Sequence, residues 1–352
     1  MTSALLEVSG LKTWFGNKER PLRAVDGVDF KINRGETFAL LGESGCGKSV
    51  TALSLLRLNP QPVSRIVAGS IKLKGENLLN LSESDMQAIR GRRIAMIFQE
   101  PQSSLNPVLS VGEQIGECLK YHFSLTDKAL ISRIIELLEA VGIPDPTQRI
   151  KDYPHQLSGG MKQRVMIAMA LAGEPELLIA DEPTTALDVT IQAQILALLK
   201  DIQTKTGMAI LLISHDLAVV AQIADHIAVM YAGQIVETGS REQFFTSHQH
   251  PYTNKLFDAI PTEQKRQQRL TVIKGNVPAL TQTFEGCRFV ERCDHAWQTC
   301  HSCVPQWFEQ EQHGIRCHLL DPDSDIEHVM VEQQHKLSPL SEVLPADKTV
   351  LT

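Results

Sequence analysis

The sequence has no long hydrophobic run and no recognisable leader. No stretch approaches the roughly 18 consecutive apolar residues that a membrane-spanning helix requires. The first residues, Met1-Thr-Ser-Ala-Leu5, carry neither the basic region nor the apolar core of a signal peptide. We therefore expect a chain that stays in the cytoplasm and reaches a membrane only through a partner.

An excess of basic residues is also missing. The chain has 34 Lys and Arg against 41 Asp and Glu, a formal net charge of −7. Proteins that bind DNA or RNA usually present a basic surface, because contacts to phosphates dominate their affinity. The charge balance therefore predicts no nucleic-acid partner. With 352 residues, the chain is long enough for two domains or for one domain with an appendage.

A glycine-rich segment is the central feature of what the sequence does contain. It matches the phosphate-binding pattern G-x-x-x-x-G-K-[ST] and comprises Gly42, Glu43, Ser44, Gly45, Cys46, Gly47, Lys48 and Ser49. An apolar stretch of strand length precedes it, and a helical pattern begins with Val50. Glycines let backbone N–H groups approach phosphates, and the helix start adds partial positive charge. We expect Lys48 to reach the β- and γ-phosphates and Ser49 to bind Mg²⁺.

Polar side chains follow three further strand-like segments. Gln99 follows 94–98, Asp181 and Glu182 end 177–182, and His215 follows 209–214. The carboxyl ends of parallel strands meet at the ligand crevice of an open α/β sheet. We expect Asp181 to hold Mg²⁺, usually through water, and Glu182 to orient or deprotonate an attacking water. His215 belongs to the same edge as Glu182, which favours a role at the site.

Two helix starts carry capping residues. Ser158 precedes Gly159 and Gly160 at the start of a helix that is predicted to run to about Ala172. Two glycines at a helix start cost stability, so the alternative to a simple cap is a phosphate that approaches the backbone closely. Asp188 is placed to cap the next helix, 189–206.

The remaining pattern predicts an α/β fold with two additions to its core. Residues 5–8 and 22–32 alternate as strands and predict a small antiparallel sheet beside the nucleotide. Trp14 or Phe15, between these strands, is suited to stack on a base, and a half-buried strand aromatic is the alternative. Residues 100–157 predict a helical insert, and residues 227–237 predict a terminal hairpin.

Taken together, these motifs resemble an ATP-binding cassette (ABC) ATPase over about residues 5–245. Leu157-Ser-Gly-Gly-Met161 is similar to the signature loop of that family, and the other motifs follow in the family's order. Met161 stands where many members carry Gln, a common variation. The resemblance implies a P-loop NTPase core that hydrolyses ATP with Mg²⁺, with an antiparallel β subdomain and a helical insert at about 100–157.

The resemblance also implies roles for individual residues. Phe15 becomes the adenine-stacking aromatic. The signature loop, with Ser158, Gly159 and Gly160, serves the ATP bound to the opposite subunit of a dimer. The implied catalytic set is Glu182, His215, Gln99 and Lys48, the implied Mg²⁺ set is Ser49, Gln99 and Asp181, and the implied nucleotide contacts include the phosphate loop through Val50 and Asp188.

Further motifs resemble the branch that imports dipeptides, oligopeptides, nickel and glutathione. They are residues 99–107, His250-Pro-Tyr-Thr253, residues 275–278 and residues 286–289. The resemblance implies a nucleotide-binding domain at 1–245 and a C-terminal extension of the peptide-importer type at 246–320. Residues 321–352 are polar and without pattern, so we expect a mostly disordered tail.

The function implied is an ATPase subunit that energises peptide import across the bacterial inner membrane. The expected partners are a similar but non-identical ATPase subunit, two integral membrane permease subunits and, indirectly, an extracellular binding protein. A nickel or glutathione importer is the alternative within the branch. Alternatives of another class are a soluble ABC ATPase of translation or DNA repair and a regulatory module with an inert nucleotide site.

Seven cysteines in a cytoplasmic chain favour metal or reactive chemistry over disulfides. Five crowd into one segment, at Cys287, Cys293, Cys300, Cys303 and Cys317. Their spacing matches neither a ferredoxin nor a zinc ribbon. Resemblance to the peptide-importer branch implies that Cys287, Cys293, Cys300 and Cys317 bind a 4Fe–4S cluster and that Cys303 does not. Zinc, with the nearby His295, His301 and His318, and inert thiols are the alternatives.

Overall fold

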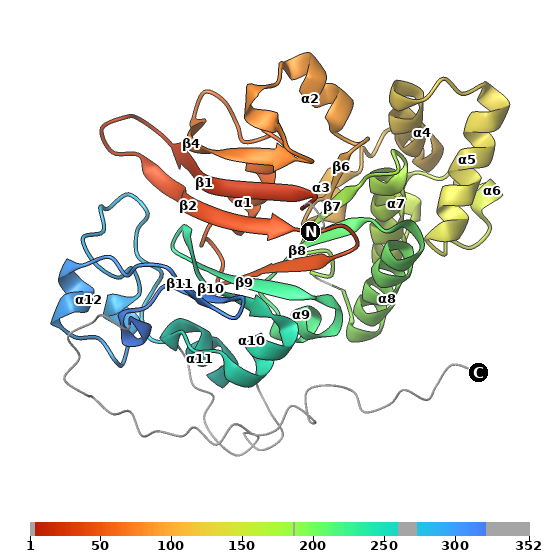
Figure 1. The fold of residues 1–352 in the computed structure, drawn as a ribbon. Coiled ribbons are helices and arrows are strands. Elements are labelled where there is room, and N and C mark those ends of the chain that lie inside the picture. Colours follow the sequence, from red (N-terminus) through yellow and green to blue (C-terminus); the bar gives the residue numbers. More distant parts are fainter. Residues whose placement is uncertain (1–3, 186, 260–272, 322–352) are drawn as a thin grey trace.

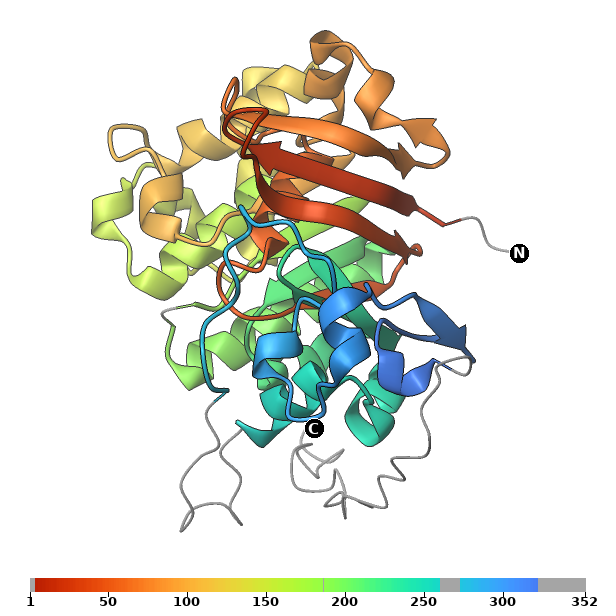
Figure 2. The same cartoon turned by 90° about the vertical axis from the view of Figure 1, so that its left-hand side faces the viewer.

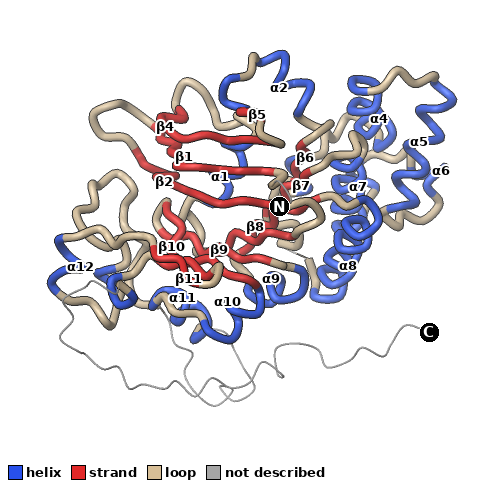
Figure 3. Tube along the Cα trace, in the orientation of Figure 1, coloured by secondary structure: helices blue, strands red, loops and turns tan. Residues whose placement is uncertain are grey.

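The computed structural model describes residues 4–185, 187–259 and 273–321. The described chain forms two sheets (Figures 1 and 3). A four-stranded sheet has the order β2-β1-β4-β5, and an eight-stranded sheet has the order β11-β12-β10-β9-β3-β8-β7-β6. The disordered tail expected at 321–352 lies, apart from Asp321, outside the described residues.

The four-stranded sheet is antiparallel, as predicted. Its strands are β1 (Leu6–Phe15), β2 (Leu22–Ile32), β4 (Ser64–Leu73) and β5 (Glu76–Asn77). In β1 the side chains of Leu6, Val8 and Leu11 are buried, in keeping with a strand that has one face on the core. The strand expected at 5–8 extends to Phe15, so Trp14 and Phe15 are its last residues and do not lie between strands as we expected.

Five parallel strands form one side of the eight-stranded sheet, from β9 to the edge strand β6. They are β3 (Thr37–Leu41), β6 (Ile94–Ile97), β7 (Leu177–Asp181), β8 (Ala209–Ser214) and β9 (His226–Tyr231). Every residue of β3, β7 and β8 is buried, so these strands are continuous apolar runs of the kind found in sheets covered on both faces. Ala39 and Leu41 enter one core and Phe38 and Leu40 the other.

Helices pack against the two sheets. They are α1 (Lys48–Leu55), η1 (Leu78–Asn80), α2 (Glu83–Ile89), α7 (Gly159–Leu171), α8 (Val189–Thr206) and α9 (Leu217–Ile223). Two predicted caps are present, because Ser158 Oγ accepts from Met161 N at 3.3 Å and Asp188 Oδ1 accepts from Ile191 N at 2.9 Å. Gly207 ends α8 with φ of 69°, a left-handed conformation that glycine adopts without strain.

The predicted helical insert is present at the right-hand end of Figure 1. It contains α3 (Pro101–Ser104), α4 (Val111–His122), α5 (Asp127–Ala140), α6 (Pro146–Arg149) and η2 (Pro154–Gln156). In α5 the apolar stripe is mostly buried, with Leu130, Ile134 and Leu138 in the core. Ile131, which the same pattern includes, is 51% exposed.

The C-terminal segment continues the core sheet instead of forming a separate unit (Figure 2). Strand β10 (Gln234–Ser240) completes the predicted hairpin with β9, and β12 (His313–Ile315) then pairs with β10, followed by β11 (Phe308–Gln310). Its helices are α10 (Arg241–Ser247), α11 (Pro251–Asp258), η4 (Val290–Arg292), α12 (Gln298–Ser302) and η5 (His318–Leu320). Within the described ranges, no helix is both long and apolar enough to cross a membrane.

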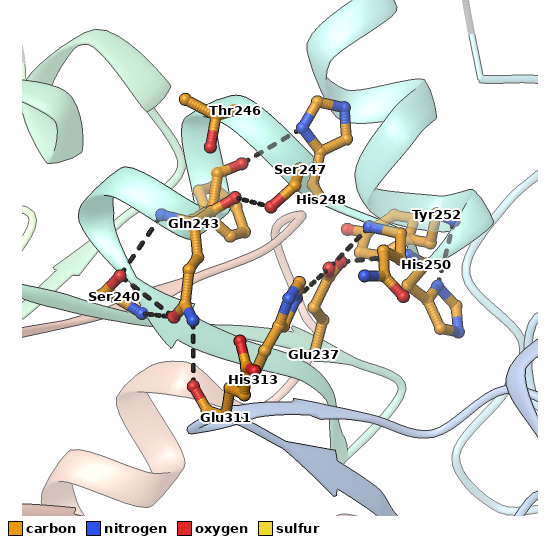
Figure 4. A network of polar contacts seen from close by, with 12 residues as sticks. Glu237, Ser240, Gln243, Thr246, Ser247, His248, His250, Tyr252, Glu311 and His313 are labelled. Carbon is orange, nitrogen blue, oxygen red and sulfur yellow. Dashed lines mark hydrogen bonds and ion pairs between the residues drawn. The ribbon is translucent and has the colours of Figure 1, made fainter. Parts of the chain in front are cut away.

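A buried carboxylate fastens this segment to the sheet (Figure 4). The side chain of Glu237, on β10, is fully buried. It accepts hydrogen bonds from His313 Nε2 at 2.8 Å, from the backbone N–H of Gln249 at 2.7 Å and from that of His250 at 3.2 Å. Burial alone would raise the pKa of Glu237, but the hydrogen bonds from His313 and Gln249 outweigh it and hold the pKa below its ordinary value.

We predict that Glu237→Gln lowers the free energy of unfolding by about 2–3 kcal/mol, the range for hydrogen bonds to a buried charged group. The amide cannot accept from three donors and turns an N–H₂ group toward some of them. Urea unfolding followed by circular dichroism measures the loss. The matched control is Glu309→Gln, the same change at an exposed position of β11, which should leave stability within about 0.5 kcal/mol.

The pH dependence gives a second check on Glu237. Because its pKa is lowered in the folded chain, its contribution is complete above the ordinary value of 4.5 and is lost as pH falls through the folded value. Wild-type stability should therefore fall more steeply below pH 4.5 than that of Glu237→Gln. Parallel curves for the two proteins would contradict a stabilising charge at this position.

Candidate functional site

The candidate site lies where four neighbouring parallel strands end. In the order β3-β8-β7-β6, these strands lead into the phosphate loop, His215, the pair Asp181 and Glu182, and Gln99. Because the strands are parallel, their carboxyl ends share one edge of the sheet. The tertiary structure thus brings together side chains that are spread over more than a hundred residues of sequence.

The phosphate loop is already folded between β3 and α1. Gly47 has φ of 112°, and a Cβ atom there would collide with the carbonyl oxygen of Ala24. A Cβ atom at Gly42 would meet the carbonyl oxygen of Met230. These positions therefore require glycine. No side chain caps α1, so the N–H groups of its first turn remain available to an anion.

Lys48 is folded back over this loop. Its amine donates to the carbonyl oxygen of Gly42 at 2.7 Å and to that of Glu43 at 2.9 Å, and the residue is 5% exposed. Cys46, also in the loop, is fully buried beneath it, and burial raises the pKa of its thiol. Only the backbone of Cys46 is therefore suited to contact a phosphate.

Asp181 has the properties of a cation ligand. It is 4% exposed, and its Oδ1 atom is buried without a hydrogen-bond partner among the described residues. Burial raises its pKa, and the nearby Ser49 hydroxyl partly opposes that rise. An oxygen-seeking cation such as Mg²⁺ would satisfy this orphaned atom, and Ser49 supplies a second oxygen. The residues present therefore fit the predicted Mg²⁺ site.

Glu182 is the centre of the polar network at this edge. Its Oε1 atom contacts His215 Nδ1 at 2.9 Å, and its Oε2 atom accepts from Gln99 Nε2 and from Thr185 Oγ1, each at 2.9 Å. Its backbone has φ of 48°, unusual for a residue other than glycine and a kind of strain that clusters at functional sites. Burial would raise the pKa of Glu182, but the hydrogen bonds from His215 and Thr185 hold it below its ordinary value.

This arrangement fits a base that acts on water. At neutral pH Glu182 is a carboxylate, which offers about four acceptor positions. Three are used by Gln99, Thr185 and His215, and one acceptor position remains for a water molecule. Of the sequence-predicted trio, Gln99 and His215 therefore each contact Glu182. Thr185 joins them although its sequence position carried no signal beyond proximity to Glu182.

The two candidate aromatics differ in their surroundings. The Arg23 guanidinium lies over the Trp14 ring, 5.2 Å from its centroid. Phe15 is half-buried, and among the described residues no ring or guanidinium stacks on it. This difference supports Phe15 as the partner of an adenine ring, which stays a prediction.

The signature residues do not reach the phosphate loop of their own chain. Ser158 and Gly159 are exposed at the start of α7. In the described part of the chain, no hydrogen bond or ion pair joins residues 158–160 to residues 42–50. Asp188 is also exposed, and its carboxylate caps α8. These residues are therefore free to act on a nucleotide held elsewhere, which stays a prediction.

Four of the five clustered cysteines share one cavity. Cys287, Cys293, Cys300 and Cys317 line it, and Cys303 is exposed and does not. Burial, reinforced by the neighbouring thiols, raises the pKa of Cys287 to about 11 and that of Cys317 to about 12. Over the described residues, no three His, Cys, Asp or Glu side chains are arranged to hold a single metal ion.

Two contacts to the phosphate loop were missed by the sequence analysis. Arg292 and Tyr252, both from the C-terminal segment, bond to Glu43. Tyr252 lies in the His-Pro-Tyr-Thr motif, which marked a subfamily but indicated no role, and Arg292 lies among the cysteines.

Comparisons with known proteins agree with this geometry. Residues 25–185 match the family described as ABC transporter, and residues 236–300 match that described as oligopeptide/dipeptide transporter, C-terminal region. The chain is 50% identical over 322 residues to the oligopeptide transport ATP-binding protein AppD of Bacillus subtilis, covering 91% of this chain and 98% of that one. It is 48% identical to the dipeptide transport ATP-binding protein DppD of Bacillus subtilis, covering 90% and 95%.

Solved structures support the fold. An ATP-binding cassette solved as a dimer in a post-hydrolysis state with ADP and Pi has a TM-score of 0.61 and 25% identity, covering 67% of this chain and 98% of that one. The cbiO1 protein of Clostridium perfringens, part of an ABC transporter complex, has a TM-score of 0.60 and 27% identity, covering 69% and 91%.

We predict that Glu182→Gln reduces the rate of ATP hydrolysis at least 100-fold, about the contribution of a positioned base, while ATP affinity stays within a few-fold of wild type. The amide keeps the side-chain shape but cannot take a proton. Phosphate release and equilibrium nucleotide binding measure the two quantities. Glu136→Gln, the same change at an exposed position of α5, is the control, and near-wild-type hydrolysis by Glu182→Gln would remove Glu182 from this role.

Proposed function

The chain belongs to the ABC transporter family, in its oligopeptide/dipeptide branch, and on that premise we propose that it is the ATP-hydrolysing subunit of an importer that carries peptides across the bacterial inner membrane. Identity near 50% over nine-tenths of the chain to proteins named for oligopeptide and dipeptide transport supports the transport role. The contacts among Glu182, His215 and Gln99 support the enzymatic role.

Hydrolysis is proposed to depend mainly on positioning and electrostatics, as in other phosphoryl transfers. Backbone N–H groups of the phosphate loop and the start of α1 bind the phosphate oxygens. The Lys48 amine exchanges its bonds to Gly42 and Glu43 for bonds to the β- and γ-phosphates. Phe15 stacks on the base.

Glu182 orients the attacking water and accepts its proton. His215 holds one carboxylate oxygen of Glu182, and Gln99 and Thr185 hold the other, so the base stays aligned. Asp181, Ser49 and Gln99 would hold Mg²⁺, which supplies charge stabilisation at the phosphates when bound.

The active form is proposed to be a dimer with two ATP molecules between the subunits. The exposed Ser158 and Gly159, together with the half-buried Gly160, would bind the ATP of the second ATPase subunit. Asp188 would lie near a nucleotide at the same interface. We propose a similar but non-identical second subunit, two membrane-spanning permease subunits and a substrate-binding protein that acts through them. This assembly would hold the chain at the cytoplasmic face of the membrane as a peripheral protein.

Gln99 is the proposed link to the permease subunits. It contacts Glu182 at 2.9 Å, and the preceding Phe98 is 42% exposed. A shift of this segment on docking would therefore move the base. Peptide is the proposed cargo, with nickel and glutathione as alternatives, because the other subunits choose the substrate.

The four-cysteine cavity is proposed to hold a 4Fe–4S cluster through Cys287, Cys293, Cys300 and Cys317. The donor set is all sulfur, the ligand type of such clusters. Burial raises the pKa of the Cys287, Cys293 and Cys317 thiols, so a bound cation is needed before thiols gathered in this cavity can ionise together. Zinc is the alternative. A single ion needs ligands gathered around one point, and the described residues show no such group. The bound group would brace the segment structurally.

We predict that the chain co-purifies from membranes with two integral membrane proteins and a second ATPase subunit. In the proposed dimer the signature loop of one subunit acts on the ATP bound to the other. The isolated chain should therefore hydrolyse ATP weakly, and the assembled complex should hydrolyse it much faster. ATPase assays on both samples measure this. Full, transport-coupled hydrolysis by this chain as a homodimer with the membrane subunits would refute the heterodimer, and recovery with ribosomes or DNA instead would refute the transport role.

We further predict that anaerobically purified protein is brown, with about four irons per chain. Cys287→Ser should remove the colour and weaken assembly, because one ligand to the cluster is lost. Cys303→Ser, at the exposed fifth cysteine, is the matched control and should change neither. Iron and zinc analysis with absorption spectra decide the outcome. Colourless protein with one zinc per chain would overturn the cluster, and loss of colour in Cys303→Ser would overturn the ligand choice.

A further inference from the structure

The cysteine-bearing segment makes direct contact with the phosphate loop. Arg292, the last residue of η4 and the neighbour of Cys293, extends its guanidinium to Glu43 of the loop. The two distances are 2.7 Å from Nη1 to Oε2 and 2.9 Å from Nη2 to Oε1. Such a two-point pair with a carboxylate is the strongest and most directional that a side chain can make. The Arg292 side chain is 4% exposed and that of Glu43 is 28% exposed, so the guanidinium is shielded from solvent and the carboxylate is half-buried.

Arg292 is held in place independently of Glu43. Its Nε donates to the carbonyl oxygen of Lys274 at 3.0 Å, and Nη1 also donates to Tyr231 Oη at 3.3 Å. Its own carbonyl oxygen accepts from Lys255 Nζ at 2.7 Å. The guanidinium is therefore preorganised by groups outside the loop, and it can impose a position on Glu43 instead of following it.

Glu43 is in turn held through all of its polar groups. Its carboxylate pairs with Arg292, its N–H donates to Tyr252 Oη at 3.0 Å, and its carbonyl accepts from Lys48 Nζ at 2.9 Å. The Tyr252 ring is itself fully buried and packs on Tyr231, with ring centroids 4.6 Å apart. The Glu43 carbonyl also accepts from the backbone N–H of Cys46 at 3.3 Å, so two of the four restraints on Glu43 come from outside the loop.

In the proposed function the bond from Lys48 would be lost on nucleotide binding, because its amine would move from the Glu43 carbonyl to the phosphates. Glycines at Gly42, Gly45 and Gly47 leave the loop free to adopt other conformations once that bond is gone. The bonds from Arg292 and Tyr252 do not involve the Lys48 amine, so its departure does not break them. They keep the N–H groups of the loop directed at the nucleotide while Lys48 changes partners.

We propose that Arg292 is a positioning residue for ATP binding, which sets the conformation of the phosphate loop through Glu43 and makes the cysteine-bearing segment part of the nucleotide site. The proposal deepens the ATPase function proposed above. It assigns to the C-terminal segment a direct effect on ATP affinity, in addition to any effect on assembly.

The test is a double-mutant cycle on the full-length chain, with a fluorescent ATP analogue as the probe. Arg292→Met should raise the Kd about tenfold, the ratio that corresponds to 1.4 kcal/mol, and Arg292→Lys should recover part of it. Glu43→Gln should weaken binding as well. The double variant should bind no more weakly than Arg292→Met, because both changes remove the same contact. In the assembled complex KM should rise while kcat at saturating ATP stays within about twofold of wild type.

Arg316→Met is the matched control. Arg316 belongs to the same segment, but its guanidinium lies over the Trp307 ring and donates to the Pro305 carbonyl, away from the phosphate loop. The Kd of the Arg316→Met variant for the ATP analogue should equal that of wild type. Metal content and thermal stability are measured for every variant, so that a loss of folding or of a bound metal is recognised.

Wild-type affinity in Arg292→Met, or losses that add in the double variant, would overturn the proposal. If Arg292→Met fails to fold, the Glu43→Gln variant decides the test by itself. Unchanged affinity of that variant for the ATP analogue also overturns the proposal. Failure of the wild-type chain to bind the analogue at all would overturn the proposed ATPase function, a result distinct from either of these.

Discussion

The parallel pairing of β3, β8, β7 and β6 is the constraint on which the catalytic edge depends. Each strand delivers polar groups to the same edge, and the hydrogen bonds to Glu182 from His215 and Gln99 are made only if the strands keep their register. A strand that slipped by one residue would turn these side chains to the opposite face. The fully buried apolar residues of β3, β7 and β8 hold the register, so the hydrophobic core and the chemistry are linked.

The C-terminal segment is integrated with this core at three separate points. Glu237 and His313 join β10 to β12, Arg288 pairs with Asp26 of β2 at 2.6 Å, and Arg292 pairs with Glu43. Both partners of the first two pairs are buried, and in the third the guanidinium is buried, so the loss of one partner leaves a buried charge or hydrogen-bonding group without compensation. The segment therefore has to fold onto the nucleotide-binding core and is not a loosely attached appendage.

The thiols of this segment that line the cavity raise a similar electrostatic problem, because a charge that forms in a buried site needs a partner. The raised pKa values of Cys287, Cys293 and Cys317 mean that these thiols are neutral in the described structure. A bound cation would reverse that balance and draw the four sulfur atoms together. Since Arg292 lies directly before Cys293, the backbone that carries a ligand also carries the guanidinium that holds the phosphate loop.

The sequence alone determined the parts of this protein that depend on short-range rules. Glycines that permit the phosphate loop, apolar runs of strand length, and the caps Ser158 and Asp188 are local features, and they predicted β3, β8, α7 and α8 nearly to the residue. The polar residues that end the strands followed from the same pattern, which is why Lys48, Asp181, Glu182 and His215 were identified without a structure.

Only the tertiary structure decided which distant groups meet. Arg292 and Glu43 are 249 residues apart, and Arg288 and Asp26 are 262 apart, so no local pattern reveals either pair. Three other features likewise depend on long-range packing. Arg23 covers Trp14, four of the five clustered cysteines line one cavity, and β11 and β12 extend the core sheet. Such contacts are set by how whole elements pack together, and that information is not contained in any short stretch of sequence.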